Sequence, residues 1–116
     1  MGFAKTEKIW FNGRLVDWDD AKVHVLAHGL HYGTGVFEGV RCYDTPAGPA
    51  VFRSTDHFQR LHDSAQLIGM QIPYPVEELR TAANDLISAN GLRECYIRPI
   101  AFYGFKELGV SARGNP

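Results

Sequence analysis

Two consecutive amphipathic helix patterns, with strand-like segments before and after them, constrain the fold of this chain more than any other sequence feature. Ser54 or Thr55 can cap the first helix, and Gly69 can end it. The second helix begins near Pro75 and stops at residues 90–91. Their apolar positions are Phe58, Leu61, Ala65 and Ile68 in the first, and Val76, Leu79, Ala83, Leu86 and Ile87 in the second. Each helix therefore carries one apolar stripe, which has to be buried against another element.

The segments around the helices have the features of strands joined by short turns. Residues 12–13 are Asn-Gly between two apolar runs, which is the strongest short-range signal for a two-residue hairpin turn. Residues 36–43 (VFEGVRCY) and 50–53 predict two more strands, with a turn rich in proline and glycine between them. Residues 94–103 (ECYIRPIAFY) predict a last strand, in which Pro99 indicates an edge position or a bulge.

The order of these segments predicts the fold class. Strands, two helices and a further strand, joined by short links, indicate an α+β fold, a two-layer sandwich with a mostly antiparallel sheet and both helices on one face. Residues 27–35 hold three glycines and predict a turn or a short helical segment. Because the periodicity ends after Tyr103, we expect a small domain over residues 1–103. Residues 104–116 then form an interdomain or interface loop, cut within its passage.

Charge and composition exclude several kinds of partner. Twelve basic and thirteen acidic residues give a net charge of -1, without a basic stripe that could bind nucleic acid. No apolar stretch has the length of a membrane span, and the N-terminus lacks the apolar core of a signal peptide. The spacing of Cys42 and Cys95 fits neither a redox nor a zinc motif. We therefore expect a cytoplasmic protein with reduced thiols and with no membrane or nucleic-acid partner.

Tyr96 and Arg98 are the first candidate binding residues, because a strand places residues two apart on the same side. Together they offer a hydroxyl and a planar cation that could hold a carboxylate. The structural alternative is an arginine whose stem packs on the tyrosine ring at a sheet edge. The pair alone favours this alternative.

Arg60 is a candidate phosphate ligand in the first helix, because its guanidinium fork matches phosphate oxygens. The alternative is a solvent-exposed arginine that forms a weak ion pair with Asp56 or Asp63 on the same helix. Taken alone, the residues favour the ion pair.

A pocket could form around Tyr32, Phe37, Gly39 and Arg41. The aromatic rings would give it apolar walls, and a glycine lets a ligand approach the backbone. Core aromatics with a glycine at a strand bulge are the more common origin of such a group. The five histidines lack the spacing of metal ligands, so we expect no metal site.

Four motifs, in order along the chain, resemble a known family. They are IWFNG (9–13), AKVHVLAHGLHYGTGVFEGVRCYD (21–44), FRSTDHFQRLHDSA (52–65) and YIRPIAFYG (96–104). Together they resemble the N-terminal domain of bacterial branched-chain amino-acid aminotransferases, which are class IV, or fold type IV, pyridoxal-phosphate enzymes. The resemblance runs from about residue 8 to residue 110, nearly the whole chain.

The resemblance assigns roles to the candidate residues. It implies that Arg60 binds the phosphate of pyridoxal 5'-phosphate. It also implies that Tyr96 meets the region of the substrate α-carboxylate, and that Arg98 with Tyr32 binds the side-chain carboxylate of glutamate. The implied substrates are branched-chain amino acids, glutamate and their 2-oxo acids.

Further implications concern the pocket and the rest of the enzyme. Phe37 and Gly39 would line the pocket for branched side chains, and Val110 would reach the site of a neighbouring subunit in a homo-oligomer. The family's Schiff-base lysine lies in a C-terminal domain, and none of the four lysines here has an activating environment. We therefore expect no catalytic residue in this chain and no activity without that partner domain. A D-amino-acid aminotransferase domain, an aminodeoxychorismate lyase domain and a stand-alone binding or dimerisation module are the alternatives.

Overall fold

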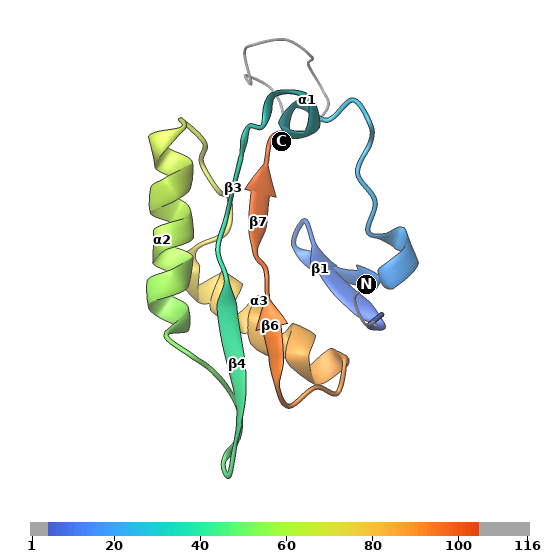
Figure 1. Ribbon diagram of the computed structural model, residues 1–116, viewed down its shortest axis with the longest axis vertical. Coiled ribbons are helices and arrows are strands. Elements are labelled where there is room, and N and C mark those ends of the chain that lie inside the picture. The colour runs from blue at the N-terminus through green and yellow to red at the C-terminus, as the bar shows by residue number, and fades with distance from the viewer. Residues whose placement is uncertain (1–4, 105–116) are drawn as a thin grey trace.

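The computed structural model describes residues 5–104 of the chain, whose elements follow one another as Figure 1 shows. The strands are β1 (Lys8–Phe11), β2 (Arg14–Asp17), β3 (Gly35–Phe37), β4 (Val40–Thr45), β5 (Gly48–Val51), β6 (Cys95–Ile97) and β7 (Ile100–Phe102). The helices are the 3-10 helix η1 (Trp18–Asp20), α1 (His28–Tyr32), α2 (Ser54–Leu67) and α3 (Val76–Ala89). Each ladder between these strands is antiparallel, which confirms the predicted α+β fold.

Strands β3 and β4 run beside β7 and β6 as one bent antiparallel ribbon (Figure 1). The long strands predicted over residues 36–43 and 94–103 are therefore each divided in two. Pro99 has no N–H to donate to the ladder, which explains the break between β6 and β7. The break between β3 and β4 falls at Glu38 and Gly39, where a glycine at a strand bulge was one interpretation of the sequence. There the Glu38 N–H donates to the Pro99 carbonyl oxygen at 3.0 Å, so the two breaks lie opposite each other.

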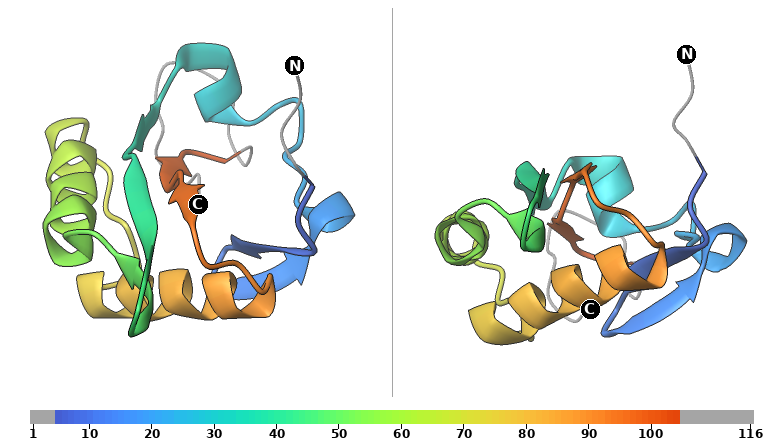
Figure 2. Two further views of the ribbon diagram at one scale, coloured as in Figure 1. Left: turned by 60° about the horizontal axis from the view of Figure 1, so that its bottom comes forward. Right: turned by 90° about the horizontal axis from the view of Figure 1, so that it is seen from below.

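The two faces of the bent ribbon differ in burial. Val40 and Cys42 are buried on the inner face, whereas Arg41 and Tyr43 are exposed on the outer face. Figure 2 shows α2 beside β3 and β4, with α3 crossing at an angle to α2. The buried cluster between the helices consists of Phe58, Leu61, Leu79 and Ala83, with Trp10, Val36, Ile72, Tyr74, Val76 and Ile97 packed against it. Both helices thus contribute to one core on the inner face, as predicted.

Helix α2 begins differently from the prediction. The expected cap at Ser54 or Thr55 is wrong, because the residue before the helix is Arg53 and no side chain caps the helix start. Arg53 has a left-handed φ of 51°, which turns the chain into the helix one residue earlier. The Ser54 hydroxyl oxygen instead accepts a hydrogen bond from Nε of Arg80 on α3, at 3.0 Å. This bond links the two helices.

The predicted turns have the backbone conformations that they require. Asn12 and Gly13 have φ values of 51° and 91°, and a two-residue hairpin turn needs positive φ at both positions. Gly69 and Gly91 follow α2 and α3 with φ values of 75° and 62°, the left-handed conformation that ends a helix. Helix α2 ends at Leu67, and Ile68, an expected member of its apolar stripe, lies just beyond the helix and is 46% exposed.

Asn90 attaches the first strand to the end of α3. Its side-chain oxygen accepts hydrogen bonds from the backbone N–H groups of Glu7 and Lys8, at 3.0 and 2.8 Å. Its side-chain nitrogen donates to the carbonyl oxygens of Lys8 and Leu86, at 3.0 and 3.1 Å. One side chain therefore satisfies polar groups of two elements that lie far apart in the sequence.

Replacing Asn90 by alanine is expected to destabilise the protein by about 1–3 kcal/mol, because backbone groups of β1 lose their partners. Thermal unfolding of the variant would measure this effect. Asn84, exposed on the same helix, provides the matched control, and its alanine variant is expected to change stability by less than about 0.5 kcal/mol. Equal melting temperatures for the two variants would contradict the role of Asn90.

Candidate functional site

Four of the predicted site residues meet on the outer face of the bent ribbon: Phe37, Gly39, Tyr96 and Arg98, here called the arginine–aromatic cluster. The guanidinium carbon of Arg98 lies 4.4 Å from the centroid of the Phe37 ring and 5.4 Å from that of the Tyr96 ring. One terminal nitrogen of Arg98 also donates a hydrogen bond to the Tyr96 hydroxyl oxygen at 2.9 Å. Two rings and a hydroxyl therefore hold this cation at the strand breaks.

The observed contacts are compatible with both interpretations of the pair Tyr96 and Arg98. The arginine lies against the tyrosine ring, as the structural alternative describes. The guanidinium and the phenolic hydroxyl also lie side by side on an exposed surface, as carboxylate binding requires. The packing contact is therefore compatible with a binding role.

Gly39 gives the cluster its room. A β-carbon at this position would lie 2.2 Å from the Tyr96 hydroxyl oxygen and 3.0 Å from the ring carbon that carries it. These separations are well below the roughly 3.5–4.0 Å at which nonbonded carbon atoms pack, so any side chain here would displace Tyr96. Glycine at this position therefore leaves room for the Tyr96 hydroxyl in its hydrogen bond with Arg98.

The cluster is open to solvent in this chain. Phe37 and Tyr96 are 58% and 52% exposed, and neighbouring Ile100 is 60% exposed. Large apolar side chains grouped on one sheet face indicate a surface that binds a ligand or another part of a protein.

Tyr32 lies apart from the cluster, on α1 at the end of β7. The Gly29 N–H donates to the Tyr103 carbonyl oxygen at 3.0 Å and holds the helix there. The Tyr32 ring centroid lies 4.6 Å from that of His28. Within residues 5–104, no hydrogen bond or ring contact joins Tyr32 to Arg98. Their shared carboxylate site stays a prediction, and Val110 lies outside the described residues.

Arg60 on α2 contacts a partner that the sequence pattern did not indicate. Its Nε donates to Oε2 of Glu38 at 2.8 Å, and Nδ1 of His57, one turn earlier, lies 3.1 Å from Oε1. The predicted alternative partners are engaged elsewhere, since Asp56 accepts from Arg53 at 2.8 Å and Asp63 accepts from Gln59 at 3.1 Å. The ion pair expected for Arg60 along its own helix is therefore wrong.

The carboxylate of Glu38 is buried and charged. Its side chain is 5% exposed, whereas that of Arg60 is 68% exposed. The hydrogen bond from Arg60, assisted by the one from His57, holds the pKa of Glu38 below its ordinary value, although burial opposes this shift. The carboxylate in turn raises the pKa of Arg60. The ion pair therefore persists at neutral pH.

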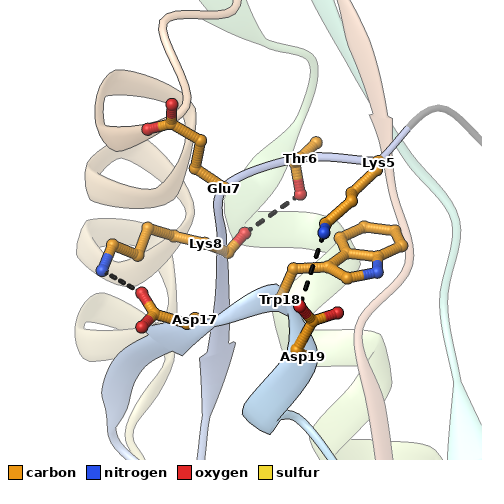
Figure 3. Close-up of a pocket in the computed structure, with 7 residues that line it drawn as sticks. All are labelled: Lys5, Thr6, Glu7, Lys8, Asp17, Trp18 and Asp19. Carbon is orange, nitrogen blue, oxygen red and sulfur yellow. Dashed lines mark hydrogen bonds and ion pairs between the residues drawn. The ribbon is translucent and has the colours of Figure 1, made fainter.

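An open pocket lies near the start of the chain (Figure 3). It is lined by Lys5, Thr6, Glu7, Lys8, Asp17, Trp18 and Asp19. Nζ of Lys5 lies 3.4 Å from Asp19, and Lys8 donates to Asp17. The hydrogen bond with Asp17 raises the pKa of Lys8, which keeps this amine protonated and a poor nucleophile. The pocket thus contains paired charges and none of the predicted site residues.

Two further kinds of feature are not found in residues 5–104. No three histidine, cysteine, aspartate or glutamate side chains are grouped as metal ligands would be. Nor is any helix in this range long and apolar enough to cross a bilayer.

Cys42 and Cys95 are free thiols that face each other across β4 and β6.

The sequence profile of one family, described as amino-transferase class IV, matches residues 35–116. The chain belongs to the class IV aminotransferase family. The matched region begins with β3, so it includes the arginine–aromatic cluster, Glu38 and Arg60.

Curated relatives of this chain include two branched-chain-amino-acid aminotransferases. That of Escherichia coli (strain K12) is 52% identical over 111 residues, which cover 96% of this chain and 36% of the relative. That of Pseudomonas aeruginosa is 53% identical over 106 residues, which cover 91% of this chain and 34% of the relative. The chain therefore spans little more than a third of the length of these relatives.

Solved structures of the same kind share the fold. The branched-chain amino acid aminotransferase of Escherichia coli matches with a TM-score of 0.90 and 52% identity, over 92% of this chain and 36% of that one. The branched-chain aminotransferase of the thermophilic archaeon Thermoproteus uzoniensis, solved with norvaline, matches with a TM-score of 0.89 and 44% identity, over 95% of this chain and 37% of that one. The resemblance inferred from the four motifs is thus confirmed.

Glu38 and His57 are the residues of the candidate site that sequence reasoning missed. One signal for Glu38 was available, because it occupies an inward-facing position between Val36 and Val40 in an apolar run. An acidic residue at such a position needs a partner inside the protein. His57 has no comparable signal, since no acidic residue lies three or four positions from it along the helix.

Proposed function

We propose that this chain is the N-terminal domain of a branched-chain amino-acid aminotransferase, with residues 104–116 as the segment that follows the domain. The enzyme would transfer an amino group between leucine, isoleucine or valine and 2-oxoglutarate. The observation that carries the proposal is the arginine–aromatic cluster, in which a cation and apolar rings share one open surface. Family membership and the identity to named branched-chain aminotransferases support it.

The cluster suits an enzyme that must accept two different side chains. Phe37, with the space beside Gly39, would contact the branched side chain, and each buried methylene would contribute about 0.8 kcal/mol. Arg98 would bind the side-chain carboxylate of glutamate, and Tyr96 would lie near the substrate α-carboxylate. An apolar surface bordered by an arginine can therefore serve both half-reactions.

Pyridoxal 5'-phosphate fits the residues present, because Arg60 is exposed and permanently charged, and within residues 5–104 only its inner nitrogen makes a hydrogen bond. When bound, this cofactor supplies the electron sink that makes the Cα proton of an amino acid removable. Arg60 would bind its phosphate. The Schiff-base lysine would belong to the C-terminal domain, and in the proposed homo-oligomer Val110 would line the site of a neighbouring subunit.

Replacing Arg98 by alanine in the full-length enzyme is expected to lower kcat/KM for glutamate roughly ten- to a hundredfold, because a charge-assisted hydrogen bond to the substrate is lost. The change for leucine should be much smaller, since its side chain has no carboxylate. Steady-state kinetics with both amino acids would measure the difference.

Arg14, exposed on β2 away from the cluster, provides the control, and its alanine variant should leave both reactions unchanged. Equal losses for glutamate and leucine in the Arg98 variant would contradict the assigned role. An enzyme that accepts D-alanine or aminodeoxychorismate in place of leucine would overturn the branched-chain proposal itself.

A further inference from the structure

Glu38 is a buried acidic residue placed between the two parts of the proposed site. Along the chain it lies between Phe37 and Gly39, whose positions belong to the outer face of the ribbon. Its own side chain points inward to α2, where each carboxylate oxygen has one partner. The break between β3 and β4 thus brings a charged group into a largely apolar interior.

Burial of a carboxylate is unfavourable unless charge and hydrogen bonds compensate for it. Arg60 and His57 supply this compensation from one face of α2, since residues three apart on a helix are neighbours. The contact is asymmetric, because Glu38 is 5% exposed whereas Arg60 is 68% exposed. The fixed group in this pair is therefore the glutamate, and the arginine is the group that reaches solvent.

The contact uses only one of the guanidinium nitrogens. Nε donates to Glu38, and the two terminal nitrogens make no hydrogen bond to any residue in the range 5–104. These two nitrogens form the planar fork that matches phosphate oxygens. An exposed arginine without such a contact would sample many rotamers and would lose that freedom on binding.

We propose that Glu38 is a positioning residue, which holds Arg60 through Nε and so presents the outer edge of the guanidinium to the phosphate of the bound cofactor. This inference rests on the proposed function, because it takes Arg60 as the phosphate ligand. Glu38 itself touches neither cofactor nor substrate. Its contribution is the orientation of Arg60 before the phosphate arrives.

The test compares the affinity of the full-length apoenzyme for pyridoxal 5'-phosphate with its affinity for pyridoxal, which lacks the phosphate. Glu38→Ala is expected to weaken binding of pyridoxal 5'-phosphate roughly tenfold, about the effect of one charge-assisted hydrogen bond. Binding of pyridoxal should not change. Glu38→Gln keeps an acceptor for Nε and should lose less affinity for pyridoxal 5'-phosphate than Glu38→Ala. If the alanine variant does not fold, the glutamine variant provides the test of the positioning role.

Two further variants separate positioning from other roles. Glu78→Gln removes an exposed acid on α3 and should change neither affinity. The double variant Glu38→Ala with Arg60→Ala should bind pyridoxal 5'-phosphate no more weakly than Arg60→Ala, because Glu38 acts through the arginine. The positioning role would be overturned if the losses of affinity of the two single variants added up in the double variant. It would also be overturned if the Glu38 variants lost as much affinity for pyridoxal as for pyridoxal 5'-phosphate.

Failure of the proposed function gives a different result. If Arg60→Ala binds pyridoxal 5'-phosphate as tightly as the wild type, Arg60 is not the phosphate ligand, and both proposals fail at that point. If Arg60→Ala loses phosphate-dependent affinity and the Glu38 variants do not, only the role of Glu38 is overturned.

Discussion

Replacing Phe58 by alanine is expected to destabilise the protein by about 3–5 kcal/mol. The Phe58 ring is 3% exposed and belongs to the buried cluster with Leu61, Leu79 and Ala83, where α2 meets α3. The truncation would remove buried apolar surface and leave a cavity that the two helices cannot close. Since small domains are stable by about 5–15 kcal/mol, this one change would remove a large part of the total.

Urea unfolding followed by circular dichroism would measure the loss. Leu67 lies on the same helix and is 88% exposed, so Leu67→Ala provides a control with the same kind of truncation. The control is expected to change the free energy of unfolding by less than about 0.5 kcal/mol. Similar transitions for the two variants would show that the core is not organised around Phe58.

Replacing Gly39 by alanine is expected to disturb the arginine–aromatic cluster. The new β-carbon would overlap the Tyr96 hydroxyl, so the ring would have to swing outward and release its hydrogen bond to Arg98. Overpacking of this kind typically costs about 1–3 kcal/mol. In the proposed enzyme, we also expect a lower kcat/KM for glutamate and for leucine, because the alanine occupies pocket space.

The background Tyr96→Phe distinguishes this clash from a backbone effect. A phenylalanine lacks the oxygen that the new β-carbon would overlap, so Gly39→Ala should destabilise the Tyr96→Phe protein less than the wild type. A double-mutant cycle of unfolding free energies measures the difference. Identical costs in both backgrounds would mean that something other than the Tyr96 hydroxyl requires glycine here.

Local patterns predicted the parts of this fold that depend on local physics. The Asn-Gly hairpin turn and the glycines after both helices follow from backbone conformations that few other residues adopt. The contact between Tyr96 and Arg98 follows from their spacing along an extended chain.

The remaining features depend on contacts between residues distant in sequence. The break at Glu38 lies opposite the break at Pro99. Pro99 and Gly39 each indicate an irregularity in their own strand, but neither indicates that the two breaks face each other. The partner of Arg60 is 22 positions away, whereas helical spacing indicated acids three or four positions away. The contact at the start of α2 also involves a distant residue, since the Ser54 hydroxyl accepts a hydrogen bond from Arg80, 26 positions away.

The order of residues 37–39 has a consequence for how such an enzyme can change during evolution. Three neighbouring positions face alternately outward, inward and outward, so inserting or deleting one residue here would exchange the two sides of the strand. Glu38 would then meet the substrate surface, and a pocket residue would enter the space beside α2. Substrate preference in the proposed enzyme can therefore change through substitutions that alter the size of the side chains at Phe37 and Gly39. Insertions and deletions would be tolerated only in other parts of the site.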